Sequence, residues 1–212
     1  MFTLCKMEVV KDKETGKPME FEKVVEVRRS IRKFQSRKIE NEKIYKLVEM
    51  ARLCQSAKNR QPWKFMILEN EAKNQVADIM LDLFNKNDYE LPGYINSSKT
   101  SAKIIKNASI LILVYPEKED KWLIGDLLSI GAAIEHICLE AVNLGLGAVW
   151  IRDTVYTEEE IGKQMGYPDL QLVSAIAIGY PDESPEPRAR KPMEEILIKE
   201  NTLKDLCNDS KL

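Results

Sequence analysis

The stretch "WLIGDLLSIGAAIEHICLEAVNLGLGAVWI", residues 122–151, decides the fold of this chain. Residues 122–145 are apolar on nearly all sides and carry few charges, which predicts a long helix buried in the core or in a subunit interface. Small residues at 125 and 131–133 would allow close contact with a neighbouring helix. The run "GAVWI" that follows is short and apolar, so it predicts a strand directly after the helix.

Apolar spacing on either side of this stretch predicts the other elements. Three- and four-residue spacing predicts helices over 21–30, 40–54, 71–84 and 157–166, the last with Thr157 as its N-cap. Continuous apolar runs predict buried strands over 63–69, 109–116 and 172–181. Residues 86–99 have the composition of a loop.

The order of these elements predicts one domain over residues 1–212. Helices alternate with apolar strands, and neither an internal repeat nor a second domain boundary is visible. This pattern predicts an α/β or α+β fold with a central sheet between two helical layers. Residues 1–20 would form a loose N-terminal arm, and residues 182–212 an extended C-terminal segment on the surface or on a partner.

Composition narrows the class of protein. The chain is 44% hydrophobic and 31% charged with a net charge of −2, and it has no block of like charge, which argues against a nucleic-acid surface. No apolar run approaches the roughly 20 residues of a membrane helix, and the N-terminus is too short for a signal-peptide core. Four scattered cysteines without a CxxC pair are expected to be reduced thiols in a cytoplasmic protein.

Several kinds of catalytic site are disfavoured. The single histidine, His136, argues against a Ser-His-Asp triad and a multi-histidine metal site, and its place in a helix favours a packing or interface role. Gly145 and Gly147 form a GxG, but they follow a helix and precede a strand, the reverse of a dinucleotide-binding turn. We therefore interpret Gly145 as a helix C-cap, and we expect no metal.

Three polar segments remain to be explained. In "RRSIRKF", residues 28–34, the arginines could simply favour a helix C-terminus, or they could bind a phosphate with charged, bidentate hydrogen bonds. The segment "PRARK", residues 187–191, alone suggests a solvated tail. The loop "CQSAKNRQPWKF", residues 54–65, contains more amides and hydroxyls than a plain helix-to-strand connection needs.

Taken in series, these segments resemble the flavin-dependent nitroreductase family. The resemblance is carried by "RRSIRKF" (28–34), "SAKNRQPWKF" (56–65), "GAAIEHICLEAVNLGLGAVWI" (131–151) and "AIGYPDESPEPRARKPMEEI" (176–196). It spans about residues 21–198 and implies an α+β, three-layer α/β/α fold with a mostly antiparallel sheet. It also implies a homodimer that places the long helix at its interface and binds two FMN molecules there.

The resemblance assigns the cofactor contacts residue by residue. From one subunit, Arg28 and Ser30 would hold phosphate and ribityl oxygens, beside Arg29, and Arg32 would lie toward the pyrimidine edge of the flavin. Arg190, with Arg188 as the weaker candidate, would close on the phosphate. The other subunit would contribute Ser56, Ala57 and Asn59, which would approach the flavin ring and the ribityl chain.

The backbone at Ile151 and Arg152 is aligned with the segment that donates an N–H to flavin N5. Arg152 stands where relatives often have glycine, and its side chain would reach solvent or attract an anionic substrate. Gln55 and Lys58 replace a proline and a glycine that are common in the family, which could leave the loop less rigid. Gln61, Pro62 and Trp63 are expected to be structural.

The implied reaction needs no side-chain nucleophile. NADH or NADPH would give hydride to flavin N5, and a nitroaromatic, quinone or similar acceptor would then take it in a ping-pong reaction. Two alternatives stay open: a redox sensor or flavin store without turnover, and a family member with another reaction, such as enoate reduction, dehalogenation or flavin breakdown. Candidate pocket walls are Tyr89, Tyr94 and Trp122.

Overall fold

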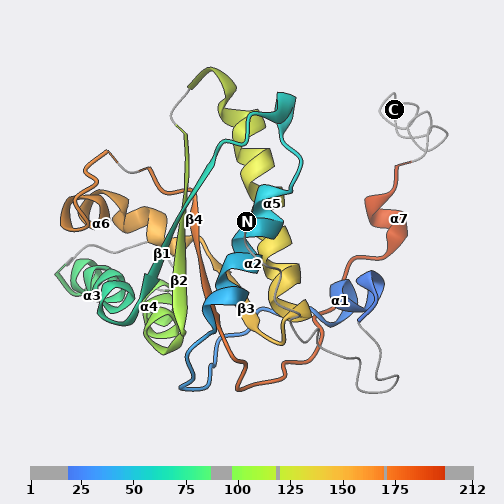
Figure 1. Ribbon diagram of the computed structural model, residues 1–212, viewed down its shortest axis with the longest axis horizontal. Helices are drawn as coiled ribbons and strands as arrows, with labels where there is room; N and C mark the ends of the chain where they lie inside the picture. The colour runs from blue at the N-terminus through green and yellow to red at the C-terminus, as the bar shows by residue number, and fades with distance from the viewer. Residues whose placement is uncertain (1–18, 87–96, 118–119, 170, 199–212) are drawn as a thin grey trace, which may run out of the picture.

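The computed structural model describes residues 19–86, 97–117, 120–169 and 171–198, and it has three layers (Figure 1). The middle layer is a four-stranded sheet in the order β1-β2-β4-β3, and every neighbouring pair is antiparallel. Its strands are β1 (Trp63–Glu69), β2 (Ile110–Pro116), β3 (Gly147–Ile151) and β4 (Ser174–Gly179). The predicted α+β, α/β/α architecture and its antiparallel sheet are confirmed.

Helices cover both faces of this sheet. On one face lie α2 (Asn41–Arg52) and α5 (Leu123–Asn143), with α1 (Phe21–Val27) against α5. On the other face lie α3 (Asn70–Lys86), α4 (Ser97–Asn107) and α6 (Glu158–Gln164). Shorter elements are the 3₁₀ turns η1 (Ala57–Asn59), η2 (Asp120–Trp122) and η3 (Asp153–Thr157), and the helix α7 (Met193–Ile196).

Strand alternation divides the interior into two cores. Along β2, Ile110 and Ile112 pack toward α2 and α5, whereas Leu111 and Leu113 pack toward α3 and α4. All four side chains are fully buried. A strand buried on both faces reads as a continuous apolar run, which is why the sequence located β2 within one residue.

Two helices were not predicted. The expected loop over 86–99 is wrong at both ends, because α3 continues to Lys86 and α4 begins at Ser97. The sequence of α4, "SSKTSAKIIKN", begins with short polar residues of low helix propensity, and packing of Ala102 and Ile105 against α3 overrides that preference. The helix α7 lies inside the expected C-terminal segment. The N-terminal arm over residues 1–18 and the end of the chain over residues 199–212 lie outside the described residues. The same is true of residues 87–96, which include the candidate pocket walls Tyr89 and Tyr94.

The long helix α5 is apolar on two sides but buried on one. Ile130, Ile134 and Ile137 are fully buried against the sheet, whereas Ile124 and Leu128 are 77% and 72% exposed. Burial in the core of one chain therefore accounts for only one side of the helix, and burial of the other side in a subunit interface stays a prediction. The helix ends as expected at Gly145, whose φ of +71° is the left-handed conformation of a C-cap glycine.

Thr157 is the N-cap residue of α6, as predicted, but its side chain makes no capping hydrogen bond. Its buried hydroxyl donates instead to the carbonyl of Thr154 at 3.0 Å.

Two glycines let the arginine segment, residues 28–34, cross the end of the sheet. A Cβ on Gly147 would lie 2.7 Å from Ile31, and one on Gly179 would lie 2.8 Å from Phe34. Because no larger residue fits, Ile31 and Phe34 press directly onto β3 and β4, and both are buried. This packing fixes the segment while leaving Arg32 between them exposed.

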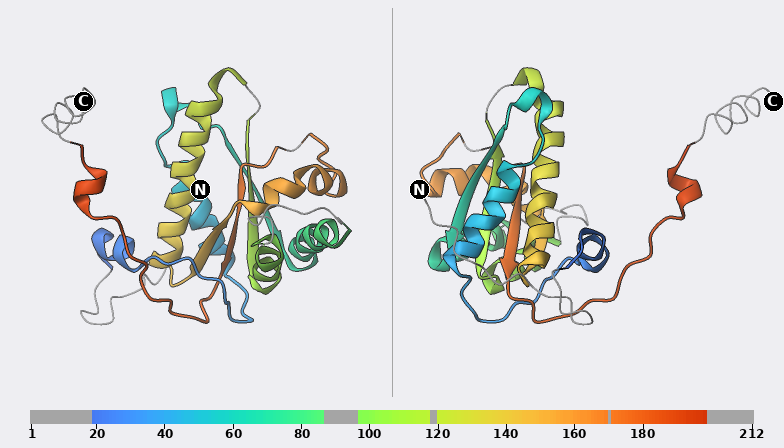
Figure 2. Two further views of the ribbon diagram at one scale, coloured as in Figure 1. Left: turned by 180° about the vertical axis from the view of Figure 1, so that it is seen from behind. Right: turned by 45° about the vertical axis from the view of Figure 1, so that its right-hand side comes forward.

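The C-terminal segment leaves the body of the molecule after β4. Figure 2 shows it running outward past α1, so that α7 lies away from the sheet. Met193, Ile196 and Leu197 are each more than half exposed. An extended segment on the surface or on a partner is predicted for 182–212, and this stays a prediction.

Candidate functional site

The arginine segment is held at the edge of the sheet by its backbone. Ser30 forms a parallel bridge with Ala148, and the Ile31 N–H donates to the Ala148 carbonyl at 3.0 Å. Since β3 is an edge strand, this bridge places the predicted arginines along an otherwise open strand edge. The structure thus gathers Arg28, Arg29 and Ser30 in one place.

Arg28 and Arg29 have different partners: a carboxylate for Arg28 and backbone carbonyls for Arg29. The Arg28 Nε lies 3.1 Å from Oε1 of Glu135 on α5, and both side chains are partly exposed. Arg29 donates through Nη1 to the carbonyls of Glu26 and Arg28, at 2.6 Å and 2.8 Å. Its Nε is buried and has no hydrogen-bond partner among the described residues. A buried guanidinium N–H without an acceptor is costly, so this position suits an oxygen of a bound anion.

The next residues are tied to the start of the C-terminal segment. The backbone N–H groups of Arg32 and Lys33 both donate to the Glu183 carboxylate, and Asp182 N–H donates to the Lys33 carbonyl at 2.9 Å. The Arg32 guanidinium donates to the Ser30 carbonyl at 3.1 Å and is otherwise exposed. The backbone of residues 32–33 is therefore fixed, while the Arg32 guanidinium stays available to a ligand.

Arg188 and Arg190 are not brought to this cluster. Both are exposed on the outward-running C-terminal segment, and Arg190 donates to the Arg188 carbonyl at 3.2 Å. Among the described residues, no hydrogen bond or ion pair joins either of them to Arg28 or Ser30.

The loop over 56–61 is bonded mainly to itself. The Ser56 Oγ accepts the Gln61 N–H at 2.9 Å, and the Asn59 Oδ1 accepts from Gln61 Nε2 at 3.3 Å. Lys58, Asn59 and Gln61 have φ values of +52°, +55° and +50°. Non-glycine residues seldom adopt this left-handed conformation, and Lys58 adopts it at the position where glycine is common in the family.

This loop is anchored to the first turns of α5. The Ala57 N–H donates to Ser129 Oγ at 3.2 Å, and the Ala57 methyl group faces Gly125. Arg60 Nε and Nη2 donate to the two carboxylate oxygens of Asp126 at 3.0 Å and 3.2 Å. Because the Asp126 side chain is only 3% exposed, this ion pair is the strongest electrostatic link between loop and helix.

Sequence reasoning missed the Arg60–Asp126 pair. A usable signal was present, because Asp126 is the one acid in the otherwise apolar run 122–134. Trp122 had been considered as a pocket wall, but the structure places it beside this pair, with the Arg60 guanidinium 5.3 Å and the Lys58 ammonium 4.8 Å from its ring centroid. All these contacts hold the loop in shape.

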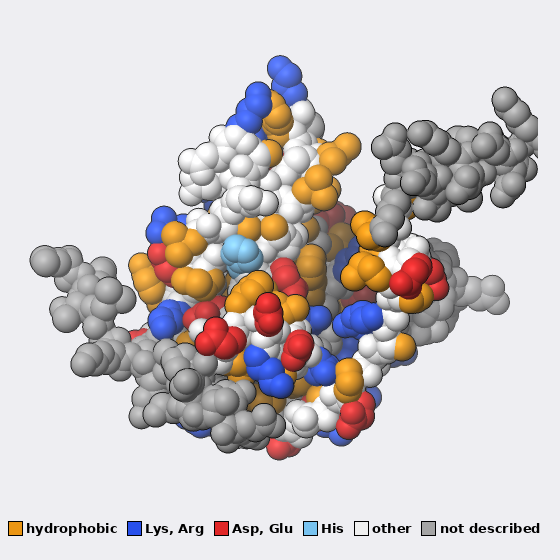
Figure 3. Space-filling view, turned by 90° about the vertical axis from the view of Figure 1, so that its right-hand side faces the viewer, with side chains coloured by type: hydrophobic (Ala, Val, Ile, Leu, Met, Phe, Trp, Pro, Cys, Tyr) orange, Lys and Arg blue, Asp and Glu red, His pale blue; other side chains and the backbone are white. Residues whose placement is uncertain are grey.

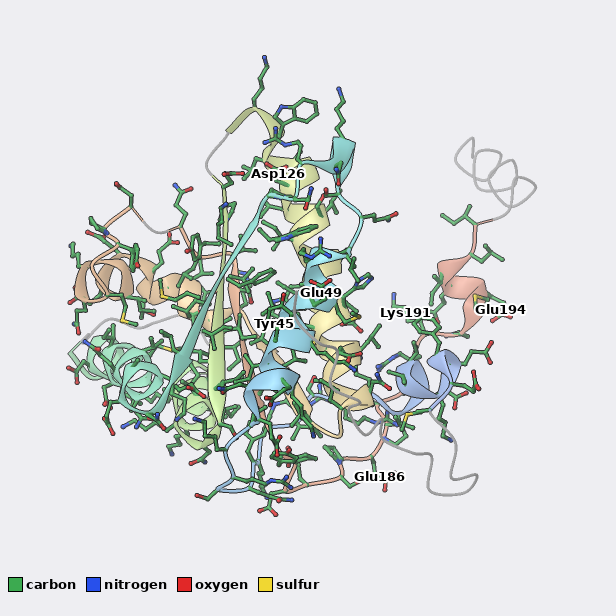
Figure 4. The ribbon with its side chains drawn as sticks, in the orientation of Figure 1. Tyr45, Glu49, Asp126, Glu186, Lys191 and Glu194 are labelled. Atoms are coloured by element: carbon green, nitrogen blue, oxygen red, sulfur yellow. The ribbon has the colours of Figure 1, made fainter. Side chains whose placement is uncertain are left out.

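Within one chain, the loop and the arginine segment lie apart. The loop contacts α5 at Gly125 to Ser129, whereas Arg28 contacts it at Glu135, which is about 9 Å further along the helix from Ser129. Figure 4 shows Asp126 near one end of α5 and Lys191 on the C-terminal segment, well away from it. Among the described residues no contact joins the two groups.

The peptide between Ile151 and Arg152 is presented at the end of β3. The Ile151 carbonyl accepts from Ser174 Oγ at 2.8 Å and from Thr154 Oγ1 at 3.5 Å. In the described part of the chain, the Arg152 backbone N–H donates to no protein group. The Arg152 side chain turns along η3, where its guanidinium donates to the Tyr156 hydroxyl at 2.7 Å, and it is exposed as expected.

The two described cysteines and the single histidine are not placed as catalytic groups. Burial raises the pKa of Cys138 to about 12 and also raises the pKa of Cys54, so both thiols stay protonated near neutral pH. His136 is exposed, with Nδ1 3.2 Å from the Met50 carbonyl. The described residues include no cluster of three or more acidic, histidine or cysteine side chains placed for a metal, and no helix among them is long and apolar enough to span a membrane.

Two grooves in the described part of the chain lie away from these residues. A groove of about 480 Å³ is lined by residues 34–38, the start of α3 and residues 106–109. A second, of about 400 Å³, is lined by Tyr115, Pro116 and residues near 166–171. Neither groove includes a residue predicted to hold the cofactor. Figure 3 shows instead that hydrophobic side chains gather around the single histidine on the face formed by α2 and α5.

Known proteins resemble this chain in sequence. A protein from Archaeoglobus fulgidus, provisionally named NADH dehydrogenase/NAD(P)H nitroreductase, is 30% identical over 172 residues, which cover 76% of this chain and 85% of that protein. The iodotyrosine deiodinase of Thermotoga neapolitana is 27% identical over 184 residues, covering 82% of this chain and 94% of that one.

A solved structure resembles the fold. A protein from Desulfovibrio desulfuricans, provisionally named nitroreductase and crystallised with FMN, superposes with a TM-score of 0.67 at 24% identity, covering 85% of this chain and 96% of that one. The family model described as "Nitroreductase family" matches residues 25–180, which include the arginine segment, the loop and β3. The chain therefore belongs to the nitroreductase family.

Proposed function

We propose that this protein is an FMN-dependent oxidoreductase that acts as a homodimer with its cofactor at the subunit interface. The observation that carries the proposal is the buried Arg29 Nε without an acceptor, in a segment with Arg28 and Arg32 beside an open strand edge. Such a cluster of guanidinium groups suits a phosphate group that bears two negative charges. The FMN in the Desulfovibrio desulfuricans complex supports the choice of ligand.

In this proposal the arginine segment holds the phosphate end of FMN. Arg28 and Arg29 bind phosphate oxygens, and Ser30 supplies a hydroxyl to the phosphate or ribityl chain. Arg32, whose backbone is fixed by Glu183, places a cation near the pyrimidine edge of the ring. Arg190 and the weaker candidate Arg188 reach the phosphate only after the C-terminal segment changes position from that in the single chain.

The dimer is proposed because one chain contains two separated halves of a site. Within one chain, the loop and the arginine segment contact α5 at Ser129 and Glu135, about 9 Å apart along the helix, and we infer that they serve different cofactors. The exposed apolar side of α5, with Ile124 and Leu128, offers a surface for a second copy. In the dimer, Ser56, Asn59 and the backbone of Ala57 would lie next to the partner's cofactor.

When bound, FMN would supply the redox chemistry, taking hydride from NADH or NADPH at N5 and passing it to an acceptor by a ping-pong mechanism. The protein's part is to orient the ring through the Arg152 N–H, to tune its charge through Arg32 and to leave one face open. Nitroaromatics and quinones are the proposed acceptors, which agrees with the NAD(P)H nitroreductase name of the Archaeoglobus fulgidus relative. We also propose that the chain is one domain over residues 1–212 and works in the cytoplasm.

Reductive dehalogenation is the second candidate reaction. It is favoured by the similarity to the Thermotoga neapolitana iodotyrosine deiodinase, which extends over 94% of that protein. The cofactor site would be the same, and the difference would lie in the acceptor pocket.

The test begins with purified full-length protein. We expect it to be yellow, to contain one FMN per chain and to lose its flavin absorbance when NADH or NADPH is added without oxygen. Acceptors are then compared in the steady state: a quinone, a nitroaromatic and a halogenated phenol. Protein that takes up no FMN contradicts the proposal, and FMN binding without turnover of any acceptor supports a flavin store or redox sensor instead.

A further inference from the structure

We propose that the buried hydroxyl of Ser174 is a positioning group for the Ile151–Arg152 peptide, whose N–H it directs and strengthens as a donor to flavin N5. This inference rests on the proposed function. It concerns a residue on β4 that does not touch the cofactor itself. Ser174 acts through the carbonyl of Ile151, which belongs to the same peptide unit as the Arg152 N–H.

The orientation of the peptide supports this role. In a trans peptide the C=O and N–H bonds point in opposite directions, and the described chain contains no cis peptide. The Ile151 carbonyl points inward to Ser174 and Thr154, whose side chains are 1% and 0% exposed. The Arg152 N–H must therefore point outward, away from the core. It donates to no described protein group, so it is available to a ligand.

The chemistry of Ser174 supports it further. The strand β4 reads "SAIAIG", and the other side chains of this fully buried strand are apolar. Burying a hydroxyl is unfavourable unless it is hydrogen-bonded, and the bond that satisfies this one is the 2.8 Å bond to the Ile151 carbonyl. An alanine at this position would be apolar like its neighbours on β4, but it could not donate the hydrogen bond to the Ile151 carbonyl.

The bond also changes how well the peptide donates. A hydrogen bond accepted by an amide oxygen polarises the amide, and the N–H at its other end becomes a stronger donor. Two hydroxyls, from Ser174 and Thr154, converge on the Ile151 carbonyl, and the shorter of the two bonds comes from Ser174. The effect is directed at one N–H, which the proposed function places at flavin N5.

The experiment measures the hydrogen bond at N5 directly, with FMN labelled with ¹⁵N at that atom and bound to the dimer. In Ser174→Ala, the N5 resonance should move downfield, toward the value of a flavin without a hydrogen bond at N5. Ser174→Cys, a weaker donor of similar size, should give an intermediate shift, and Ser174→Thr should restore the original value. Flavin reduction by NADH or NADPH should slow roughly two- to fivefold in Ser174→Ala.

A matched control is Ser98→Ala, which removes a fully buried hydroxyl that has no hydrogen-bond partner in the described chain. It should leave the N5 resonance unchanged. A wild-type resonance in FMN-loaded Ser174→Ala overturns the inference, and if that variant does not fold, an unshifted resonance in Ser174→Cys does so. Failure of the wild-type protein to bind FMN at all instead overturns the proposed function.

Discussion

The two polar regions that we assign to the cofactor are built in opposite ways. The arginine segment is anchored by apolar side chains, Ile31 and Phe34, which press onto glycines of the sheet and leave its cations free to meet a ligand. The loop over 56–61 is anchored by the buried Arg60–Asp126 ion pair, and its polar groups largely bond to each other. The first region thus supplies charge, whereas the second supplies a fixed shape. Substitution of the free cations should therefore affect ligand binding, whereas substitution of the residues that hold the loop in shape, Lys58 and Arg60, should affect stability.

The largest expected effect is on FMN binding through Arg28. Arg28→Glu replaces a phosphate donor by a repelling charge, so we expect FMN affinity to fall more than roughly 100-fold while the dimer stays folded. Fluorescence titration of the apoprotein with FMN measures this change, and circular dichroism checks the fold. The matched control is Glu135→Gln, which frees the Arg28 guanidinium and should bind FMN at least as well as the wild type. Unchanged flavin occupancy in Arg28→Glu refutes the assignment.

The next effect is on stability through Arg60. Arg60→Met leaves the buried Asp126 carboxylate without its main partner and should lower the free energy of unfolding by about 3 kcal/mol. Arg52→Met is the control, because it breaks an equally well-formed but exposed pair with Glu49 and should cost much less. Urea unfolding of both variants gives the comparison. Equal losses would mean that the burial of Asp126 does not matter.

We expect the stability of the protein to depend on pH through Glu40, which follows the arginine segment in the sequence. The hydrogen bond from the Tyr180 hydroxyl is the largest of several contacts that lower the pKa of Glu40 to about 2, from 4.5. Because the folded-state pKa is lowered, the stabilisation is fully present above about pH 4.5 and is lost as the pH falls toward 2. In Tyr180→Phe, this part of the pH dependence should shrink. Thermal unfolding between pH 7 and pH 2 tests it, and parallel curves for the two proteins would count against the assignment.

The smallest effect concerns the backbone of the loop. Lys58→Gly relieves a left-handed conformation that costs about 1 kcal/mol for a residue with a Cβ, but it loses a contact with Trp122 worth about 0.5 kcal/mol. We expect a net stabilisation of at most about 0.5 kcal/mol, since glycine also gains entropy when the chain unfolds. Differential scanning calorimetry resolves this change. A clear destabilisation would show that the lysine side chain matters more than the backbone.

Some elements of the fold can be predicted from the sequence, and others cannot. Strands buried on both faces, such as β2, and the strand β3 are visible as apolar runs, and the glycine after α5 marks its end. The helix α4 was missed because its polar start hides a face that only α3 completes. Local patterns carry no information about a partner that lies far away in the chain.

The same reasoning applies to the candidate site. The arginine segment could be predicted because several cations in a short run are chemically distinctive. The partners of Asp126 and Ser174 could not be predicted, although Asp126 stands out as the one acid in an apolar run. Each contact spans a long separation in the sequence, to Arg60 and to the Ile151 carbonyl. The resemblance to a family named the site residues, and the glycine that it implies at position 58 is a signal that could have predicted the left-handed backbone at Lys58.

The central claim is that one cofactor site takes its charge from one chain and its loop from another. The most direct measurement mixes two differently tagged variants, Arg28→Glu and Asn59→Gly, and isolates the heterodimer. Asn59→Gly suits the positive φ at that residue and removes only the amide that the proposed function places at the partner's cofactor, so a site lined by this altered loop should bind FMN more weakly. We predict that the heterodimer binds one FMN with wild-type affinity, because one of its two sites combines an unaltered Arg28 with an unaltered loop. A heterodimer with no site of wild-type affinity would contradict the claim, since it would place both regions in a site formed within a single chain.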